Sequence, residues 1–218
     1  LATYPNMKMI AITLREGDTL LAVKEVQEQL EDGQPMIVGM AASNGKMVNF
    51  PVEECRPMGR TASGVKGIEL YEGEKVVGAT AQYEGEYILA ITDKGYGKMT
   101  HFIDEDGELT YRITKRGAKG VSTLKATEKV GNLVAIKAVS LEDDLMVITS
   151  AGIVIRTPLN QIRVAGRNTQ GVKVINLEGR QKVASVAIVP HEDPNAEEEL
   201  PAEEVEGEVQ VAEEGSNE

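Results

Sequence analysis

Short apolar runs, each about the length of a β-strand, alternate with polar turns along most of the chain. In three places one run leads through a glycine-bearing turn into a second run. The pairs are Met36–Met40 with Lys46–Phe50, Ile88–Thr92 with Gly97–Phe102, and Leu145–Thr149 with Ile153–Thr157. The first turn contains Asn44-Gly45, two residues that tolerate positive φ and favour a tight hairpin, and the other two turns keep the glycine. The pattern therefore predicts three β-hairpins.

Four further runs stand alone, and we expect each to form a strand. These runs are Leu20–Val23, Val76–Ala79, Leu133–Ile136 and Val183–Val186. The first is followed by a longer stretch than the others, and Val23, Val26 and Leu30 could also form one face of a short helix. The regular spacing of the other runs favours a strand followed by a loop insertion through Gln27–Gly33.

One motif recurs between the hairpins and the single runs. Gly59–Leu70 reads Gly-Arg-Thr-Ala-Ser-Gly-Val-Lys-Gly-Ile-Glu-Leu, and Gly166–Leu177 reads Gly-Arg-Asn-Thr-Gln-Gly-Val-Lys-Val-Ile-Asn-Leu. A looser copy aligns Arg116, Gly120, Val121 and Leu124 with Arg60, Gly64, Val65 and Ile68. We call these segments the first anchor (Gly59–Leu70), the second anchor (Arg116–Leu124) and the third anchor (Gly166–Leu177).

The spacing of the anchors indicates the fold class. Gly64, Gly120 and Gly171 are 56 and 51 residues apart, a period typical of repeat architectures. About four short strands per repeat is the layout of a propeller blade, which buries its faces only against neighbouring blades. We therefore predict an all-β, propeller-like body with three full repeats, preceded by half a unit.

The charge divides the chain into two parts. The net charge is −12, yet the last 28 residues hold 12 of the 35 acidic residues and no Lys or Arg, so the rest of the chain is neutral overall. We expect residues 1–190 to form the β body and residues 191–218 to form a disordered acidic tail. The negative net charge of the whole chain would wrongly argue against binding of nucleic acid, because the excess of acidic residues lies in the tail.

The remaining composition is plain. The chain begins at Leu1 rather than Met, so we expect a fragment or a processed product. It has no apolar run of the roughly 18 residues that span a membrane and no signal-peptide pattern, and we expect a cytoplasmic location. Cys55 is the only cysteine and is interpreted as an inert small hydrophobe.

Catalytic and metal-binding patterns are absent from the sequence. His101, His191 and Cys55 lack zinc-ligand spacing. Asp104 and Asp106 flank a glycine without further ligands at regular spacing, which favours a plain turn. The anchor glycines lack the Gly-Lys-Ser/Thr ending of a phosphate loop. We therefore expect no catalytic residue, no metal site and no cofactor in this chain.

Cations that recur at equivalent repeat positions are the candidate functional residues. Arg60, Arg116 and Arg167 share one position, and Lys66 and Lys173 share another. In a ring of equivalent blades such residues face the same way and form a stripe, which suits the phosphates of duplex DNA. The full candidate set is Arg60, Lys66, Lys98, Lys115, Arg116, Lys119, Arg156, Arg167 and Lys173. Taken singly, each of them could simply solubilise a β surface.

Several motifs together resemble one known family. They are Gly166–Val172, Arg56–Thr61 running into Gly64–Gly67, Lys94–Lys98, and Thr114–Val121, in unbroken order over about 190 residues. This set is similar to the C-terminal domain of the DNA gyrase A protein, and the acidic tail is similar too. The corresponding domain of topoisomerase IV is the close alternative, but its repeats are usually fewer or degenerate.

The resemblance implies a fold, partners and a role. The family's domain is a six-bladed β-pinwheel whose blades exchange strands and which wraps duplex DNA around a basic outer surface. That wrapping directs ATP-dependent negative supercoiling by a type II topoisomerase built of two A and two B subunits. This chain matches the second half of the ring, so the family's first-blade basic box lies outside it. The ATP and Mg of the whole enzyme act elsewhere, and we expect no topoisomerase activity from this chain alone.

Two other classes of function compete with DNA wrapping. A protein-interaction propeller would present exposed aromatic or apolar residues on its rim, but aromatic residues make up only 4% of the chain. An enzyme built on a propeller would need clustered acids and histidines, which the sequence lacks. The salt dependence of DNA binding separates these alternatives.

Overall fold

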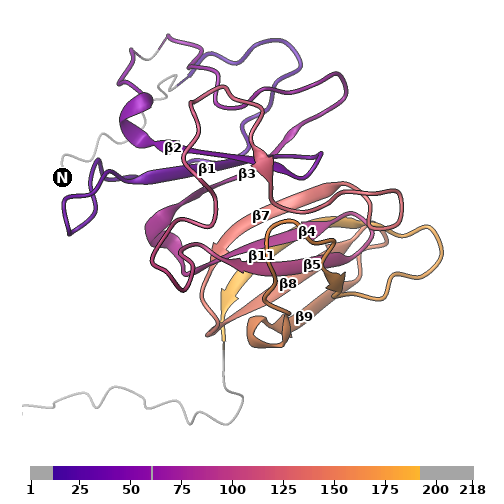
Figure 1. Cartoon of the computed structure of the whole chain (residues 1–218). Helices are drawn as coiled ribbons and strands as arrows, with labels where there is room; N and C mark the ends of the chain where they lie inside the picture. The colour runs from indigo at the N-terminus through magenta and orange to yellow at the C-terminus, as the bar shows by residue number, and fades with distance from the viewer. Residues whose placement is uncertain (1–11, 60, 192–218) are drawn as a thin grey trace, which may run out of the picture.

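Three antiparallel sheets follow one another through the computed structural model, which describes residues 12–59 and 61–191 (Figure 1). The first sheet has the order β3-β1-β2-β6, the second β10-β5-β4-β7, and the third β11-β8-β9. The strands are β1 (Ile37–Ala42), β2 (Lys46–Pro51), β3 (Val76–Ala81), β4 (Tyr87–Thr92), β5 (Tyr96–His101), β6 (Val121–Ser122), β7 (Leu133–Val139), β8 (Asp143–Thr149), β9 (Val154–Pro158), β10 (Val172–Lys173) and β11 (Val183–Pro190). Three single-turn 3₁₀ helices complete the regular structure: η1 (Val52–Glu54), η2 (Gln82–Glu84) and η3 (Leu159–Gln161).

Each predicted hairpin forms. β1 pairs with β2, β4 with β5, and β8 with β9. The turn glycines Gly45, Gly95 and Gly152 have φ of 79°, 78° and 79°, a region that residues with a side chain rarely adopt. The single runs after the anchors then pair back onto the first strand of the preceding hairpin, as β3 on β1, β7 on β4, and β11 on β8.

The anchors cross between neighbouring sheets. β6, in the second anchor, follows β5 in the chain but pairs with β2 of the first sheet. β10, in the third anchor, follows β9 but pairs with β5 of the second sheet. A Cβ on Gly120 or Gly171 would lie 2.5 Å from the carbonyl oxygen of Met47 or Gly97, so only glycine lets the anchor approach this closely. The anchor motif therefore encodes a strand exchange.

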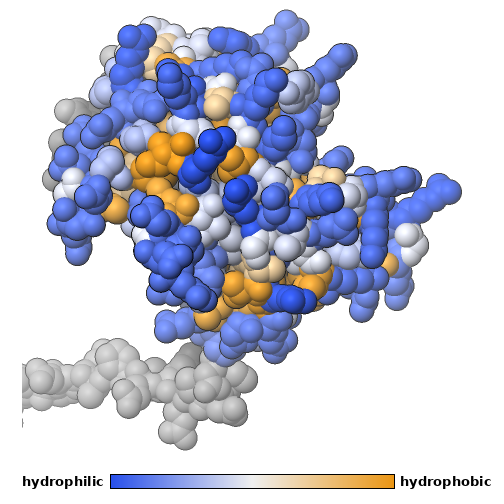
Figure 2. All heavy atoms as spheres, viewed as in Figure 1, coloured by the Kyte–Doolittle hydropathy of each residue, from blue (hydrophilic) through white to orange (hydrophobic). Residues whose placement is uncertain are grey.

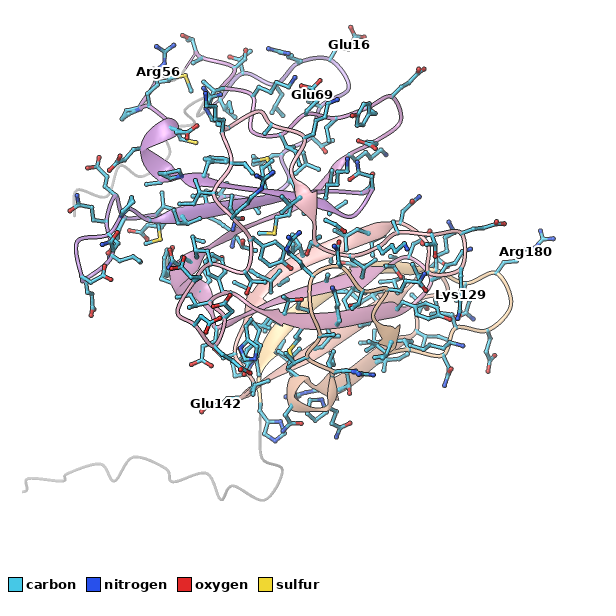
Figure 3. The ribbon with its side chains drawn as sticks, viewed as in Figure 1. Glu16, Arg56, Glu69, Lys129, Glu142 and Arg180 are labelled. Carbon is cyan, nitrogen blue, oxygen red and sulfur yellow. The ribbon has the colours of Figure 1, made fainter. Side chains whose placement is uncertain are left out.

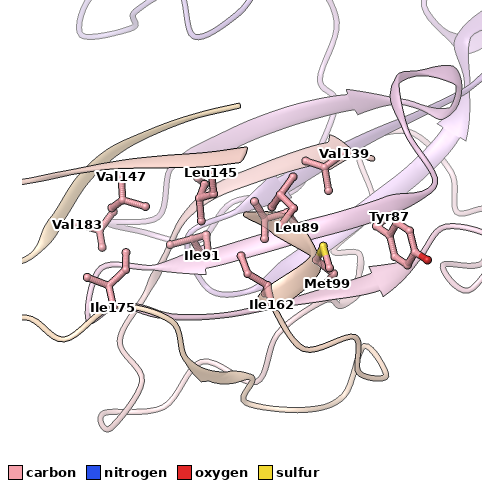
Figure 4. Close-up of a cluster of buried hydrophobic side chains, with 12 residues drawn as sticks. Tyr87, Leu89, Ile91, Met99, Val139, Leu145, Val147, Ile162, Ile175 and Val183 are labelled. Carbon is pink, nitrogen blue, oxygen red and sulfur yellow. The ribbon is translucent and has the colours of Figure 1, made fainter. Parts of the chain in front are cut away.

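The core lies in layers between the sheets. Ile88 and Ala90 of β4 join a cluster with residues of the first sheet, whereas Leu89 and Ile91 join a cluster with residues of the third. Figure 4 shows the second of these layers, in which Leu145 of β8 lies among side chains of the second sheet. Every residue of β4 is buried, because a sheet is covered on both faces when blades stack on either side of it.

The segment Leu20–Val23 corrects a prediction, because it forms no strand and Val23 is 82% exposed. The equivalent strands β3 and β7 each pair with the hairpin before them. The described residues contain no hairpin before Leu20. The helix alternative is also absent. Residues 28–36 instead fold back on themselves, with Leu30 N–H donating to Gln34 O and Met36 N–H to Glu28 O, as expected for a loop insertion.

The last described strand, β11, ends at Pro190. His191 was assigned to the tail, but its ring nitrogen Nδ1 lies 2.9 Å from Asp144 Oδ1 on β8. The rest of the tail, residues 192–218, lies outside the described residues, as does Arg60.

Candidate nucleic-acid interface

The arginine of the second anchor holds two anchors together. Arg116 Nε donates to Glu54 O at 3.0 Å, and its Nη1 donates to Lys66 O at 2.7 Å. Its backbone N–H donates to Glu54 Oε2 at 2.9 Å. Because the guanidinium group is half-buried and satisfies two main-chain carbonyls, Arg116 serves first to fix the loop after β2 against the first anchor.

The sequence predicted that Lys98 contacts a ligand at the surface, but the structure places Lys98 in the interior. It is fully buried on β5, and Nζ donates to Gly166 O at 2.5 Å and to Thr169 Oγ1 at 3.1 Å. Burial, aided by repulsion from nearby Arg167, lowers its pKa to about 8. Lys98 lies inside because β5 is covered on both faces, and its ammonium group positions the third anchor instead of facing solvent.

Four of the predicted lysines are exposed on or next to the anchors. Lys115 and Lys173 point into solvent-accessible space, and Lys66 does so while pairing with Glu69. The ammonium nitrogen of Lys119 lies 5.4 Å from the centre of the Tyr71 ring, and contact with that side chain raises the pKa of Lys119. These four side chains are therefore reachable from solvent.

Arg156 lies at a different place, on β9 beside the end of β11. Its Nε donates to Asp144 Oδ2 at 2.7 Å, and Nη2 donates to Pro190 O at 3.0 Å. Burial would raise the pKa of Asp144, but hydrogen bonds from Arg156 and His191 outweigh it and lower that pKa. Arg156 therefore closes the third sheet against the chain that leaves it, and this pairing competes with any contact to phosphate.

A second row of arginines was missed by the sequence reasoning. Arg56, Arg112 and Arg163 each precede an anchor arginine by four residues, and all three are exposed. The chain that carries Arg163 runs beside β5, since Met99 N–H donates to Arg163 O at 3.0 Å. At the equivalent point beside β2, Thr114 N–H donates to Asn49 O at 2.7 Å, two residues after Arg112. The fixed four-residue offset was the signal that could have identified this row.

The segments that carry Arg112 and Arg163 run beside β2 and β5. Figure 3 shows Arg56 projecting from the molecule on the side opposite Lys129 and Arg180. Exposed Ile113 and Val164 directly follow two of the arginines. Figure 2 shows that hydrophilic residues cover most of the visible face, with smaller apolar patches between them. The chain thus exposes three arginines at equivalent repeat positions, and two of them are followed by an exposed apolar residue.

Stacked antiparallel sheets that exchange anchor strands define a β-pinwheel, a propeller-like class of domain. A family model described as the DNA gyrase C-terminal domain, β-propeller, matches residues 40–82, 86–140 and 143–190. The chain belongs to this family. The three matched segments correspond to the three repeats, which confirms the resemblance predicted from the anchors.

Curated relatives agree with the family. The chain is 47% identical over 191 residues to the DNA gyrase A protein of Ureaplasma parvum, which covers 88% of this chain and 21% of the relative. It is 42% identical over 192 residues to the DNA gyrase A protein of Staphylococcus aureus, covering 87% and 20% respectively. The chain thus spans about a fifth of the length of these relatives.

Solved structures show the same fold. A DNA gyrase A C-terminal domain matches 83% of this chain and 58% of its own length, with a TM-score of 0.67 and 24% identity. The C-terminal domain of DNA topoisomerase IV matches 73% of this chain and 48% of its own length, with a TM-score of 0.62 and 23% identity. Among the described residues, no helix is long and apolar enough to cross a membrane.

Proposed function

We propose that this chain binds duplex DNA along its basic rim and bends it, as the DNA-wrapping part of a DNA gyrase A protein. The observation that carries the proposal is the row Arg56, Arg112 and Arg163, which repeats with the blades and is exposed at every member. Backbone phosphates need charge at regular intervals and no base reading, so a repeated arginine suits them better than a single deep pocket.

The exposed lysines extend the same surface. Lys66, Lys115, Lys119 and Lys173 belong to the proposed contact set, and Arg167 borders it from a half-buried position. Arg116 and Arg156 are engaged by protein groups and would contribute charge more than direct contacts. Lys98 is left out because it is buried. Arg60 stays a candidate by its repeat position alone.

The wider assembly follows from family membership. We infer that the chain works together with the rest of a gyrase A protein and with gyrase B proteins in the cytoplasm. There the bent DNA would direct ATP-dependent negative supercoiling, with ATP and Mg bound by other parts of the enzyme. The gyrase A relatives, at 42–47% identity, support gyrase over topoisomerase IV.

The salt dependence of DNA binding tests the proposal. Changing Arg56, Arg112 and Arg163 together to Ala should weaken binding to all duplex sequences alike. The slope of log K against log salt should flatten by roughly 0.9 for each lost phosphate contact. The measurement is fluorescence anisotropy of a labelled duplex titrated with the 218-residue chain at several salt concentrations.

A matched control removes the same charge elsewhere. Lys129, Lys137 and Arg180 are also exposed but lie outside the arginine row, so changing all three to Ala should leave most of the slope in place. Equal slopes for the two triple variants would show that only net charge matters and would contradict a phosphate-binding row. A wild-type chain that binds no duplex at low salt would reject the function itself.

A further inference from the structure

The loop insertion before β1 forms one wall of a groove. The connections that follow β3 and β7 run through residues 82–86 and residues 140–142, whereas the corresponding connection before β1 runs through residues 24–36. Within this longer loop, Leu30 N–H donates to Gln34 O at 2.8 Å, which folds the loop back on itself. The insertion therefore places Leu30 beside the ends of the first two sheets.

Three hollows meet around Leu30. Their volumes are about 550, 600 and 270 Å³, and Leu30 lines all three. Tyr83 lines the first and the second, and Ile103 lines the second and the third, so the hollows form one continuous groove. We call it the insertion groove and define it by Leu30, Gln82, Tyr83, Phe102, Ile103 and Ile113.

The insertion groove lies between the first and the second sheet, both of which the structure describes. A blade stacked before the first sheet would cover the opposite face of that sheet, which carries Val38, Met40 and Phe50. The groove instead opens beside Ile37, whose side chain packs with residues of the second sheet. The walls of the groove therefore do not depend on a preceding repeat.

Large apolar side chains are exposed along the groove. Tyr83 is 51%, Ile103 45% and Ile113 49% exposed. The Tyr83 hydroxyl donates to Glu25 O, which fixes the ring while leaving it open to solvent. Ile103 is fixed by a β-bridge to Leu109. Exposed apolar side chains that are held in place beside a hollow are typical of a surface that binds a partner.

The rim of the groove is acidic. The exposed carboxylates around it are Glu31, Asp32, Glu86, Asp104, Glu105, Asp106 and Glu108. Within residues 12–59 and 61–191 none of these carboxylates forms an ion pair. No lysine or arginine lines any of the three hollows. The groove thus carries an uncompensated negative charge, which complements a cationic ligand.

We propose that the insertion groove binds a segment of a protein partner that carries arginine or lysine beside a bulky apolar side chain. The cationic group would lie on the exposed ring of Tyr83, in the hollows that Glu31 and Glu86 line. The apolar side chain would fill the hollow lined by Phe102 and Ile103. Duplex DNA does not fit this chemistry, because its phosphates would meet carboxylates without intervening cations. The groove is therefore a contact separate from the arginine row.

Selection of random displayed peptides on the 218-residue chain tests the chemistry of the partner. Peptides are kept when they bind the wild type and not the double variant Glu31→Gln with Glu86→Gln. Both proteins carry the same acidic tail, so peptides that bind only the tail are discarded. The peptides that remain should be enriched in arginine, lysine and bulky apolar residues. Enrichment of acidic residues, or the absence of any peptide that discriminates between the two proteins, would overturn the proposal.

Hydrogen exchange then locates the bound peptide on the chain. A synthetic copy of the strongest selected peptide should slow exchange in residues 28–36 and in residues 101–109, because both segments line the groove. Slower exchange that is confined to other segments would place the contact elsewhere and reject the groove.

An apolar substitution with a matched control tests the groove independently of charge. Ile103→Thr removes apolar surface from the groove, and Ile153→Thr removes it from a residue that is 48% exposed elsewhere. Fluorescence anisotropy of the labelled peptide should show binding about tenfold weaker for Ile103→Thr and unchanged for Ile153→Thr. The charge control, Glu16→Gln with Glu178→Gln, should also bind as the wild type does. Equal losses in test and control variants would mean that the peptide senses only general surface properties.

Measurement of duplex binding in the same variants separates the groove from the arginine row. Ile103→Thr should keep the wild-type affinity for duplex DNA. The triple variant Arg56→Ala, Arg112→Ala and Arg163→Ala should keep its affinity for the peptide, although Arg112 directly precedes Ile113. Loss of duplex binding in the first variant, or of peptide binding in the second, would show one shared surface and reject the proposal. A wild-type chain that binds the peptide but no duplex would reject only the DNA-binding function.

Discussion

Lys98 provides the most direct test of the interior, because a buried ammonium group is costly unless its charge is compensated. The perturbation is Lys98→Met, which keeps the length of the side chain and removes its charge. Gly166 O would still accept from Thr169 Oγ1 at 2.9 Å, so the substitution leaves this carbonyl with a partner. The third anchor should stay on β5, which isolates the titration of Lys98 as the main change.

The magnitude follows from the pKa of Lys98. Burial, with a smaller contribution from Arg167, lowers it to about 8 in the folded chain. A lysine in the unfolded chain titrates near 10.4. Between these values the unfolded chain holds a proton that the folded chain has released, so the free energy of unfolding rises with pH. The rise is about 1.4 kcal/mol per pH unit and totals roughly 3 kcal/mol.

The assay is urea unfolding of the wild type and of Lys98→Met at pH 7, 8, 9 and 10. Subtracting the two free energies of unfolding at each pH cancels the titration of every other group. The difference should stay flat below pH 8 and then move in favour of the wild type through pH 10. Lys137→Met removes an exposed lysine from β7 of the same sheet and serves as the control, with no such change.

A difference that does not depend on pH would refute this reasoning. It would mean that Lys98 is charged equally in the folded and unfolded chains and that its ammonium group reaches water. A difference moving in favour of the variant as pH rises would mean that hydrogen bonds to Gly166 and Thr169 outweigh the cost of burial. In that case the pKa of Lys98 would lie above its ordinary value.

Two further predictions concern the anchors and the tail. Gly120→Ala should lower the free energy of unfolding by on the order of 1–3 kcal/mol, because φ is +77° and the new Cβ would meet Met47 O. Urea unfolding measures this, and Gly107→Ala, at φ of +81° with open space around it, should cost less. Deleting residues 192–218 removes only acidic charge, so duplex binding at low salt should tighten. Equal affinities with and without the tail would leave it a role in solubility alone.

The hairpins were predictable because their signals are local. Asn44-Gly45 specifies a tight turn, and alternating apolar runs on either side supply strands of the right length. The partners of the anchors were not predictable in the same way. Val121 and Val172 pair with β2 and β5, each in the hairpin before the nearest preceding one, and nothing in the motif states which edge they cover. The spacing of the anchors predicted repeated blades, and the family resemblance implied that blades exchange strands. The residue-by-residue pairing of the anchor strands could be read only from the structure.

The spacing of the repeats predicted a strand at Leu20–Val23, and the segment forms none. The segment has the composition of β3 and β7, but composition alone does not hold a strand, because its hydrogen bonds must go to a partner. β3 has β1 and β7 has β4, while Leu20–Val23 has no neighbouring strand among the described residues. Strand formation in this fold thus depends on the adjacent repeat, and Leu20–Val23 meets no partner strand among the described residues.

Recurrence in register does not by itself separate structural cations from functional ones. Arg116 fixes the second anchor to the first, because its guanidinium group satisfies Glu54 O and Lys66 O. Arg112 recurs four residues earlier and is exposed to solvent. Both positions satisfy the same sequence test, and only burial and hydrogen bonding divide them. A strong motif that builds the fold can therefore hide a weaker neighbouring pattern whose side chains stay exposed. In a repeat protein, the recurring residues that the fold leaves unused are the better candidates for binding.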